Sequence, residues 1–190
     1  MTTMLVGLLL FFGAHSISIF APAWRDAVAS RIGAMRWKLV YSLPSIVGFL
    51  LMIGGYAALR LDPQIVYLPP VGLRHVAALL MLPVFPLLLS AYLPGRLQRA
   101  AKHPMLAAVK FWALAHLLAN GMLADVLLFG SFLIWAVADR ISLKRRAERP
   151  RPMAPAGAIN DILAIAGGLA LYGLFIMGWH QRLFGVAPFG

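Results

Sequence analysis

Residues 3–23 read TMLVGLLLFFGAHSISIFAPA and contain no Asp, Glu, Lys or Arg. A run of about 20 apolar residues is long enough to cross the hydrocarbon core of a bilayer as an α-helix. Further apolar stretches occupy residues 39–59, 76–93, 105–118, 123–138 and 159–179. Lipid offers no hydrogen-bonding partner to the backbone, so spanning segments of this kind form helices. The sequence therefore predicts an all-α fold, a polytopic bundle of about six transmembrane helices.

The overall composition points to the same fold class. Of the 190 residues, 62% are hydrophobic and 12% are charged, whereas a soluble domain carries roughly 25% charged residues. We therefore expect one membrane-embedded helical domain over residues 1–190. The chain contains no cysteine, which excludes disulfides, thiolate metal sites and cysteine nucleophiles.

The formal net charge of +11 would raise nucleic acid as a partner in a soluble protein. Here the basic residues lie in short connections between apolar stretches, so we assign them to lipid headgroups rather than nucleic acid. Three connections predicted on one side hold thirteen of them: Arg25, Arg31, Arg36, Lys38, Arg96, Arg99, Lys102, Arg140, Lys144, Arg145, Arg146, Arg149 and Arg151. The other side holds Arg60, Arg74 and Arg182. This asymmetry predicts a multi-pass protein of the bacterial cytoplasmic (inner) membrane with both termini in the periplasm.

Two connecting segments have compositions of their own. Residues 24–38 are too polar to span the membrane, and their tryptophans and arginines favour an amphipathic helix in the cytoplasmic interface. Residues 140–157 are basic and rich in proline, which predicts a flexible linker held close to anionic lipid.

Polar residues inside the apolar stretches are candidates for function, because each costs free energy in lipid unless it is paired. His15 lies in the first stretch, and Trp112, His116 and Asn120 share one face of the fourth, since residues four apart are neighbours on a helix. The two histidines could hydrogen-bond to neighbouring helices and hold the bundle together. Alternatively, two imidazoles from different helices could be the axial ligands of a haem iron.

The remaining polar groups have simpler interpretations. Lys110 can extend to the cytoplasmic interface, or it could meet an acidic group such as a haem propionate. Asp125 is expected to cap the start of the fifth helix. His103-Pro104 is typical of a helix start. His75, His103 and His180 all lie at predicted helix ends, where we expect solvated or capping side chains.

Four stretches together resemble the NnrU family of bacterial integral membrane proteins. They are Gly13-Ala14-His15-Ser16, Arg36-Trp37-Lys38 with Tyr41-Ser42, His103-Pro104-Met105, and residues 110–125 (KFWALAHLLANGMLAD). The family is associated with denitrification, and with the expression or function of nitrite and nitric oxide reductases. The resemblance implies an accessory or regulatory membrane protein of nitrogen-oxide respiration, with a respiratory reductase or another membrane protein as a partner.

The NnrU family is similar in turn to the plastid 15-cis-zeta-carotene isomerase, a membrane protein that binds haem b through two histidines. This resemblance places the haem ligands on His15 and His116, and it makes a redox or gas sensor one expected role. The isomerase has a cysteine at the position of Ala113. Alanine cannot bind iron, so we expect no isomerase activity from this chain.

An enzymatic function is the alternative hypothesis. His103-Pro104 is similar to the Arg-His-Pro start of isoprenylcysteine-type membrane methyltransferases, but Lys102, Leu106 and Ala108 depart from that motif. The sequence thus leaves open a haem protein without catalytic residues, a membrane enzyme acting on a lipid or carotenoid, and a structural partner of a respiratory complex.

Overall fold

The structure is a computed structural model that describes residues 1–147, 149 and 151–189. The described part of the chain is helical, with one isolated antiparallel bridge between Ile65 and Met122. It divides into two compact units, which we describe separately. Unit 1 contains Met1–Val66 and Met122–Ala147, and unit 2 contains residues 67–121 together with the described residues from 149 onward.

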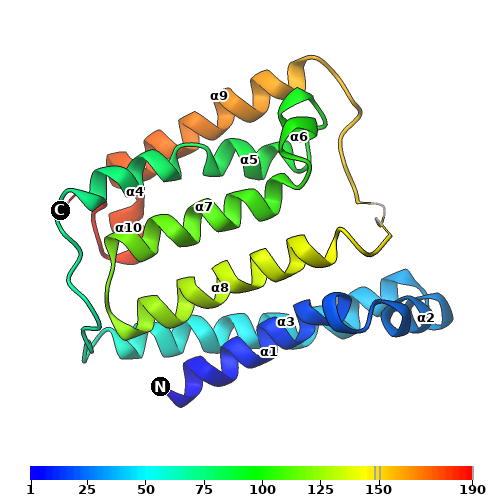
Figure 1. Cartoon of the computed structure of the whole chain (residues 1–190), viewed down its shortest axis with the longest axis horizontal. Helices are drawn as coiled ribbons and strands as arrows, with labels where there is room; N and C mark the ends of the chain where they lie inside the picture. The colour runs from blue at the N-terminus through cyan, green and yellow to red at the C-terminus, as the bar shows by residue number, and fades with distance from the viewer. Residues whose placement is uncertain (148, 150, 190) are drawn as a thin grey trace. The chain divides into compact units, whose positions relative to one another are not determined.

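Unit 1 consists of four helices, α1 (Thr2–Phe20), α2 (Pro22–Ile32), α3 (Ala34–Leu59) and α8 (Leu123–Ser142). The elements of unit 2 are coloured green and orange to red in Figure 1. They are α4 (Leu73–Met81), α5 (Val84–Ser90), α6 (Arg96–Ala101), α7 (Pro104–Ala119), α9 (Ile159–Leu174), the π-helical turn η1 (Phe175–Trp179) and α10 (His180–Phe184).

The described helices confirm the all-helical fold. Four helical stretches among the described residues are long and apolar enough to cross a membrane. Two are the single helices α1 (Thr2–Phe20) and α3 (Ala34–Leu59), and two are composite: Leu73–Ser90, which contains α4 and α5, and Ile159–Phe184, which contains α9, η1 and α10. Many of their large apolar side chains are exposed, including Leu9 at 73% and Leu43 at 72%. Such an apolar surface needs lipid as its solvent, so the chain is a membrane protein. The number of membrane crossings and the side of each terminus stay predictions.

Helices α1 and α3 pack side by side in unit 1 (Figure 1). Glycine permits the close approach of their backbones. A Cβ atom added to Gly48 would lie 2.6 Å from the Phe11 nitrogen, and Gly7 and Gly55 face the backbones of Met52 and Met4 in the same way. Small residues at a helix crossing are typical of membrane proteins, where packing and not the hydrophobic effect drives association.

Helix α8 adds the third side of the unit 1 core. Ala124 packs with Met4, Leu8 and Met52. Asp125, only 3% exposed, accepts a bond from the Met122 nitrogen (3.2 Å) at the start of α8, as predicted for a helix cap. Its other oxygen accepts a 2.6 Å bond from the Tyr56 hydroxyl, so this buried carboxyl group also joins α8 to α3.

In unit 2, α5 packs on both α7 and α9. The Gly168 backbone lies against Pro86 so closely that no side chain would fit. Asp161, at the start of α9, accepts bonds from the backbone nitrogens of Arg96 (2.8 Å) and Leu97 (2.9 Å) and so caps α6. Helix α7 begins at Pro104 with His103 as its N-cap, which confirms the predicted start.

The structure refines three sequence-based expectations. The segment 24–38 is divided at Gly33 (φ 88°) between α2 and α3, because only glycine adopts this backbone conformation easily. The predicted stretch 76–93 is interrupted between α4 and α5. The predicted linker 140–157 begins inside α8, which ends at Ser142. Arg146, just after the helix, pairs with the Asp139 carboxylate of α8 (2.7 Å). Glu148 and Pro150 of this linker lie outside the described residues, and its flexibility stays a prediction.

The contact between α1 and α3 predicts a large effect of Gly48→Val. The added side chain would press on the α1 backbone, which cannot move aside as a flexible side chain does. We expect a loss of about 1–3 kcal/mol of stability, measured as a lower thermal unfolding midpoint in mild detergent. The matched control is Gly54→Val on the same helix, where an added Cβ meets nothing within 4 Å. Equal midpoints for the two variants would contradict the close crossing.

Candidate functional site: half-buried histidines in each unit

His15 is half-buried on α1 of unit 1. Its Nδ1 lies 2.7 Å from the carbonyl oxygen of Phe11, one turn earlier on the same helix. A carbonyl oxygen can only accept, so Nδ1 donates its proton and Nε2 of the neutral ring carries the lone pair. The Phe11 ring stacks on the imidazole at 4.1 Å between centroids. This histidine is therefore held in one tautomer and one orientation, the state of a metal-ligating imidazole.

Two larger rings lie near His15 within unit 1. The ring centroids of Tyr41 and Trp135 lie 6.5 Å and 5.9 Å from that of the imidazole, both in edge-to-face arrangements. The Trp135 Nε1 atom is buried and has no hydrogen-bond partner among the described residues. A buried N–H group without an acceptor is costly. This indole is thus a candidate donor to a bound ligand beside His15.

The predicted stripe on α7 is present in unit 2. The His116 Nδ1 donates to the Trp112 carbonyl oxygen (2.8 Å), and the two rings lie 5.4 Å apart. The Asn120 side-chain amide donates to the His116 carbonyl oxygen (3.0 Å) at the end of the helix. Tyr67 donates from its hydroxyl group to the carbonyl oxygens of Leu117 and Asn120. Trp112, His116 and Asn120 therefore form one bonded series along α7, with His116 in the same tautomer as His15.

The other two residues singled out on α7 have different environments. Lys110 is half-buried, nearly two turns before His116. Ala113 is fully buried at 0% exposure and carries no atom that could bind a metal. No group of three or more His, Asp or Glu side chains in the described parts of the chain is arranged to hold a metal ion. His15 belongs to unit 1 and His116 to unit 2, and their pairing stays a prediction.

His180 lies at the start of α10, the helix-end position that the sequence predicted. It is half-buried in unit 2, with its ring centroid 6.3 Å from that of His116, a neighbour that the sequence did not indicate. Its Nδ1 donates to the Val186 carbonyl oxygen (2.6 Å). Both imidazoles line a pocket of about 150 Å³ together with Arg74 and Tyr172. In contrast, His75 is exposed, as expected for a helix-end residue.

The sequence contains a signal for a change of helix direction just before His180. Gly178 has φ 130° inside η1, a conformation open to glycine and strained for other residues. A glycine two residues before a histidine, late in an apolar run, can mark a change in helix direction.

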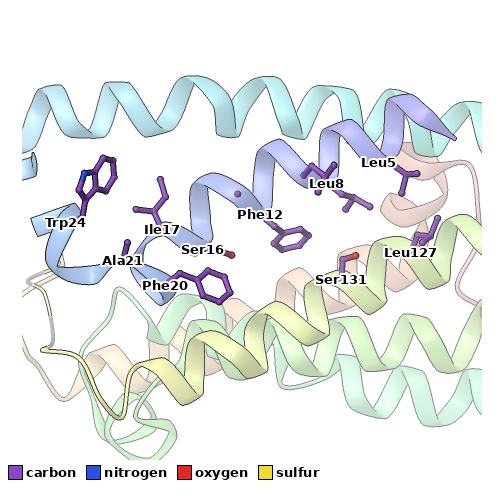
Figure 2. Close-up of a pocket in the computed structure, with 12 residues that line it drawn as sticks. Leu5, Leu8, Phe12, Ser16, Ile17, Phe20, Ala21, Trp24, Leu127 and Ser131 are labelled. Atoms are coloured by element: carbon purple, nitrogen blue, oxygen red, sulfur yellow. The ribbon is translucent and has the colours of Figure 1, made fainter.

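A larger groove of about 730 Å³ lies on unit 1 along α1, the start of α2 and α8. Figure 2 shows its lining, which is apolar except for the hydroxyl groups of Ser16 and Ser131 and the indole of Trp24. Gly13 also lines it, and an added Cβ there would meet nothing within 4 Å. His15 is not among the lining residues, so the groove and the His15 environment are separate features of α1.

These features define a helical membrane protein with oriented imidazoles inside its apolar helices. The chain belongs to the NnrU family, because the family model described as "NnrU protein" matches residues 3–188, nearly the whole sequence. The resemblance expected from the sequence is therefore confirmed. Comparisons with curated proteins and with solved structures gave no match.

The three oriented histidines generate a spectroscopic prediction. In ligand-free protein, His15, His116 and His180 should each carry the proton on Nδ1, since each Nδ1 is bonded to a carbonyl oxygen. The ¹⁵N chemical shifts of histidine-labelled protein report the tautomer, with single His→Gln variants assigning the signals. Exposed His75 is the internal control and should show a solvent-averaged ring. Protonation on Nε2 in any of the three would contradict the assigned hydrogen bonds.

Proposed function

We propose that this protein is an accessory or regulatory protein of nitrogen-oxide respiration in the bacterial cytoplasmic membrane, and that it binds haem b through His15 and His116. One observation carries the haem assignment. Both imidazoles donate Nδ1–H to a carbonyl oxygen one turn earlier, so both would offer the Nε2 lone pair to iron. Membership of the NnrU family supports the association with denitrification.

The surroundings of the two histidines are compatible with a flat apolar group. Haem iron needs only two axial protein ligands, which His15 and His116 would supply. Gly13 and Ala14 beside His15 are small, and small residues let a ligand approach a helix closely. Trp112 and Asn120 would orient His116 through the bonded series on α7. Lys110 would offer a cation to a propionate group.

His15 and His116 would hold the haem, which would supply electron transfer or redox sensing and not a reaction with a bound small molecule. In that function the protein orients the two imidazole rings, because the carbonyl oxygens of Phe11 and Trp112 hold them in place. Ala113 contributes no donor to an iron. For that reason we propose a role without catalysis and without carotenoid isomerisation.

The haem assignment predicts the optical spectrum of protein purified in mild detergent. Wild-type protein should carry close to one haem per chain, with the spectrum of a low-spin bis-imidazole species. His15→Ala and His116→Ala should each lose most of the haem, since a single remaining axial ligand binds more weakly. His75→Ala is the control, because that side chain is exposed. The assignment would be refuted if wild-type protein is colourless when purified and still binds no haem after haem is added.

We further propose six membrane crossings with both termini in the periplasm, on the basis of the charge asymmetry between connections. Alkaline phosphatase fused after residue 190 should be active, because the enzyme folds only outside the cytoplasm. A fusion after Arg146 should be inactive. The reverse pattern would overturn the orientation, and equal activity of the two fusions would overturn the number of crossings.

A further inference from the structure

The groove on unit 1 follows two neighbouring rows of residues (Figure 2). One row runs from Leu5 to Ala21 and the other from Leu8 to Trp24, each at intervals of four residues. Residues four apart lie above one another on a helix, so both rows run along the same side of α1. Two residues of α8, also four apart, line the other wall. The groove is therefore a trough along the helices and not a rounded cavity.

Small residues make the trough hollow. Gly13 and Ser16 lie midway along its α1 wall, and Ser131 lines it from α8. An added Cβ at Gly13 would meet nothing within 4 Å, so no other side chain fills this space. Larger apolar residues lie toward the ends, and Phe20 is 84% exposed. The trough thus offers an open apolar surface to a ligand of the membrane.

The dimensions favour a single hydrocarbon chain. From Leu5 to Phe20 the trough extends over roughly 22 Å at 1.5 Å per residue. Spread over that length, its volume of about 730 Å³ gives a cross-section of roughly 33 Å², too narrow for an α-helix about 10 Å across. A hydrocarbon chain is about 4 Å wide at van der Waals contact. When extended it gains about 1.25 Å per carbon, so a chain of about 16–18 carbons matches the trough in length.

One end of the trough has the character of a membrane interface. Trp24 lines this end, and its ring centroid lies 6.1 Å from that of the buried Trp37. The Arg25 guanidinium lies over the same Trp37 ring at 5.4 Å. Trp37 therefore holds both side chains at the start of α2. Indole rings are typical of the headgroup level of a bilayer, whereas the end of the trough near Leu5 is lined by leucines.

Charge on α2 favours an anionic headgroup. Arg31 lies seven positions after Trp24, which places it within about 20° on the same side of the helix. It is exposed, and neither of the two ion pairs found among the described residues involves it. Asp26, the one acidic residue of α2, lies about 200° from Trp24 and pairs with Arg25 (2.9 Å). The side of α2 that holds Trp24 thus presents a guanidinium group and no carboxylate.

We propose that the unit 1 trough binds one acyl chain of an anionic phospholipid, with the phosphate at Arg31 and the glycerol ester groups beside Trp24. Helical side chains lean toward the helix N-terminus, which for Arg31 is toward Trp24. A guanidinium group suits a phosphate because it donates two parallel hydrogen bonds. The acyl chain lies between α1 and α8 and ends near Leu5, and the second chain stays in the bilayer. The proposal is independent of the haem assignment, since His15 does not line the trough.

The test is the binding of phosphatidylglycerol to the full-length protein in nonionic detergent, measured by native mass spectrometry. Wild-type protein should bind about one equivalent, at least about fivefold more tightly than phosphatidylethanolamine with the same chains, because one basic residue near the headgroup contributes about that factor. Lysophosphatidylglycerol should bind like the two-chain lipid, since one chain fills the trough. Glycerol phosphate, which has no chain, should not bind.

Two substitutions separate the headgroup from the chain. Arg31→Gln should weaken phosphatidylglycerol binding about fivefold and leave phosphatidylethanolamine unchanged. Its control is Arg182→Gln, an equal change of charge at an exposed residue of unit 2. Ser131→Phe should fill the trough and weaken both lipids about tenfold or more. Its control is Gly130→Phe, at the neighbouring position of α8, which does not line the trough and where an added Cβ meets nothing within 4 Å.

Thermal unfolding midpoints check that each variant is folded. Should Ser131→Phe fail to fold, phosphatidylglycerol with a diazirine on its acyl chain replaces it as the probe of the wild-type protein. The label should appear in peptides from residues 5–24 or 123–131. Labelling confined to other peptides would overturn the proposal.

Other results would also overturn it. Equal binding of phosphatidylglycerol and phosphatidylethanolamine would remove the headgroup assignment, and binding of glycerol phosphate would assign Arg31 to a free phosphate. Efficient disulfide formation between two copies of Leu9→Cys without lipid would assign the trough to a second copy of the chain. The haem assignment is tested separately, because His15→Ala should lose haem and keep phosphatidylglycerol, whereas Ser131→Phe should show the opposite behaviour.

Discussion

The structure depends on one constraint: inside apolar helices, every polar group must find its hydrogen-bonding partner within the chain, because lipid supplies none. The histidines show how this works. His15 and His116 donate to carbonyl oxygens of their own helices, four residues earlier. The bond that removes the cost of a buried N–H group also selects the tautomer of the ring. The hydrogen bond that satisfies the N–H group in the membrane thus also leaves the lone pair of the neutral ring on Nε2.

The same constraint explains the contacts between helices. Asp125 is buried in unit 1 because it accepts from the Met122 backbone and from Tyr56, and so it both caps α8 and joins it to α3. Asp161 performs a similar task in unit 2 by capping α6 from the start of α9. Gly48 acts differently, since it allows α1 and α3 to approach until backbone meets backbone. Polar bonds and close packing therefore hold the helices together where the hydrophobic effect does not.

Function follows from which polar groups remain oriented after these demands are met. In unit 1 these are His15 and the indole of Trp135, whose N–H lacks an acceptor among the described residues. In unit 2 they are His116, His180 and Arg74 around a pocket that becomes apolar toward Phe85.

The amino-acid sequence by itself determined the fold class, the apolar helices and the family, because these depend on local composition and on motifs within single helices. The stripe of Trp112, His116 and Asn120 was predictable for the same reason, since helical periodicity places residues four apart on one face. Only the tertiary structure decided that His180 lies beside His116 and that Tyr56 donates to Asp125. Each of those pairs joins residues more than sixty positions apart. No local pattern encodes such a pair; it results from how the helices cross and where glycines such as Gly178 redirect the chain.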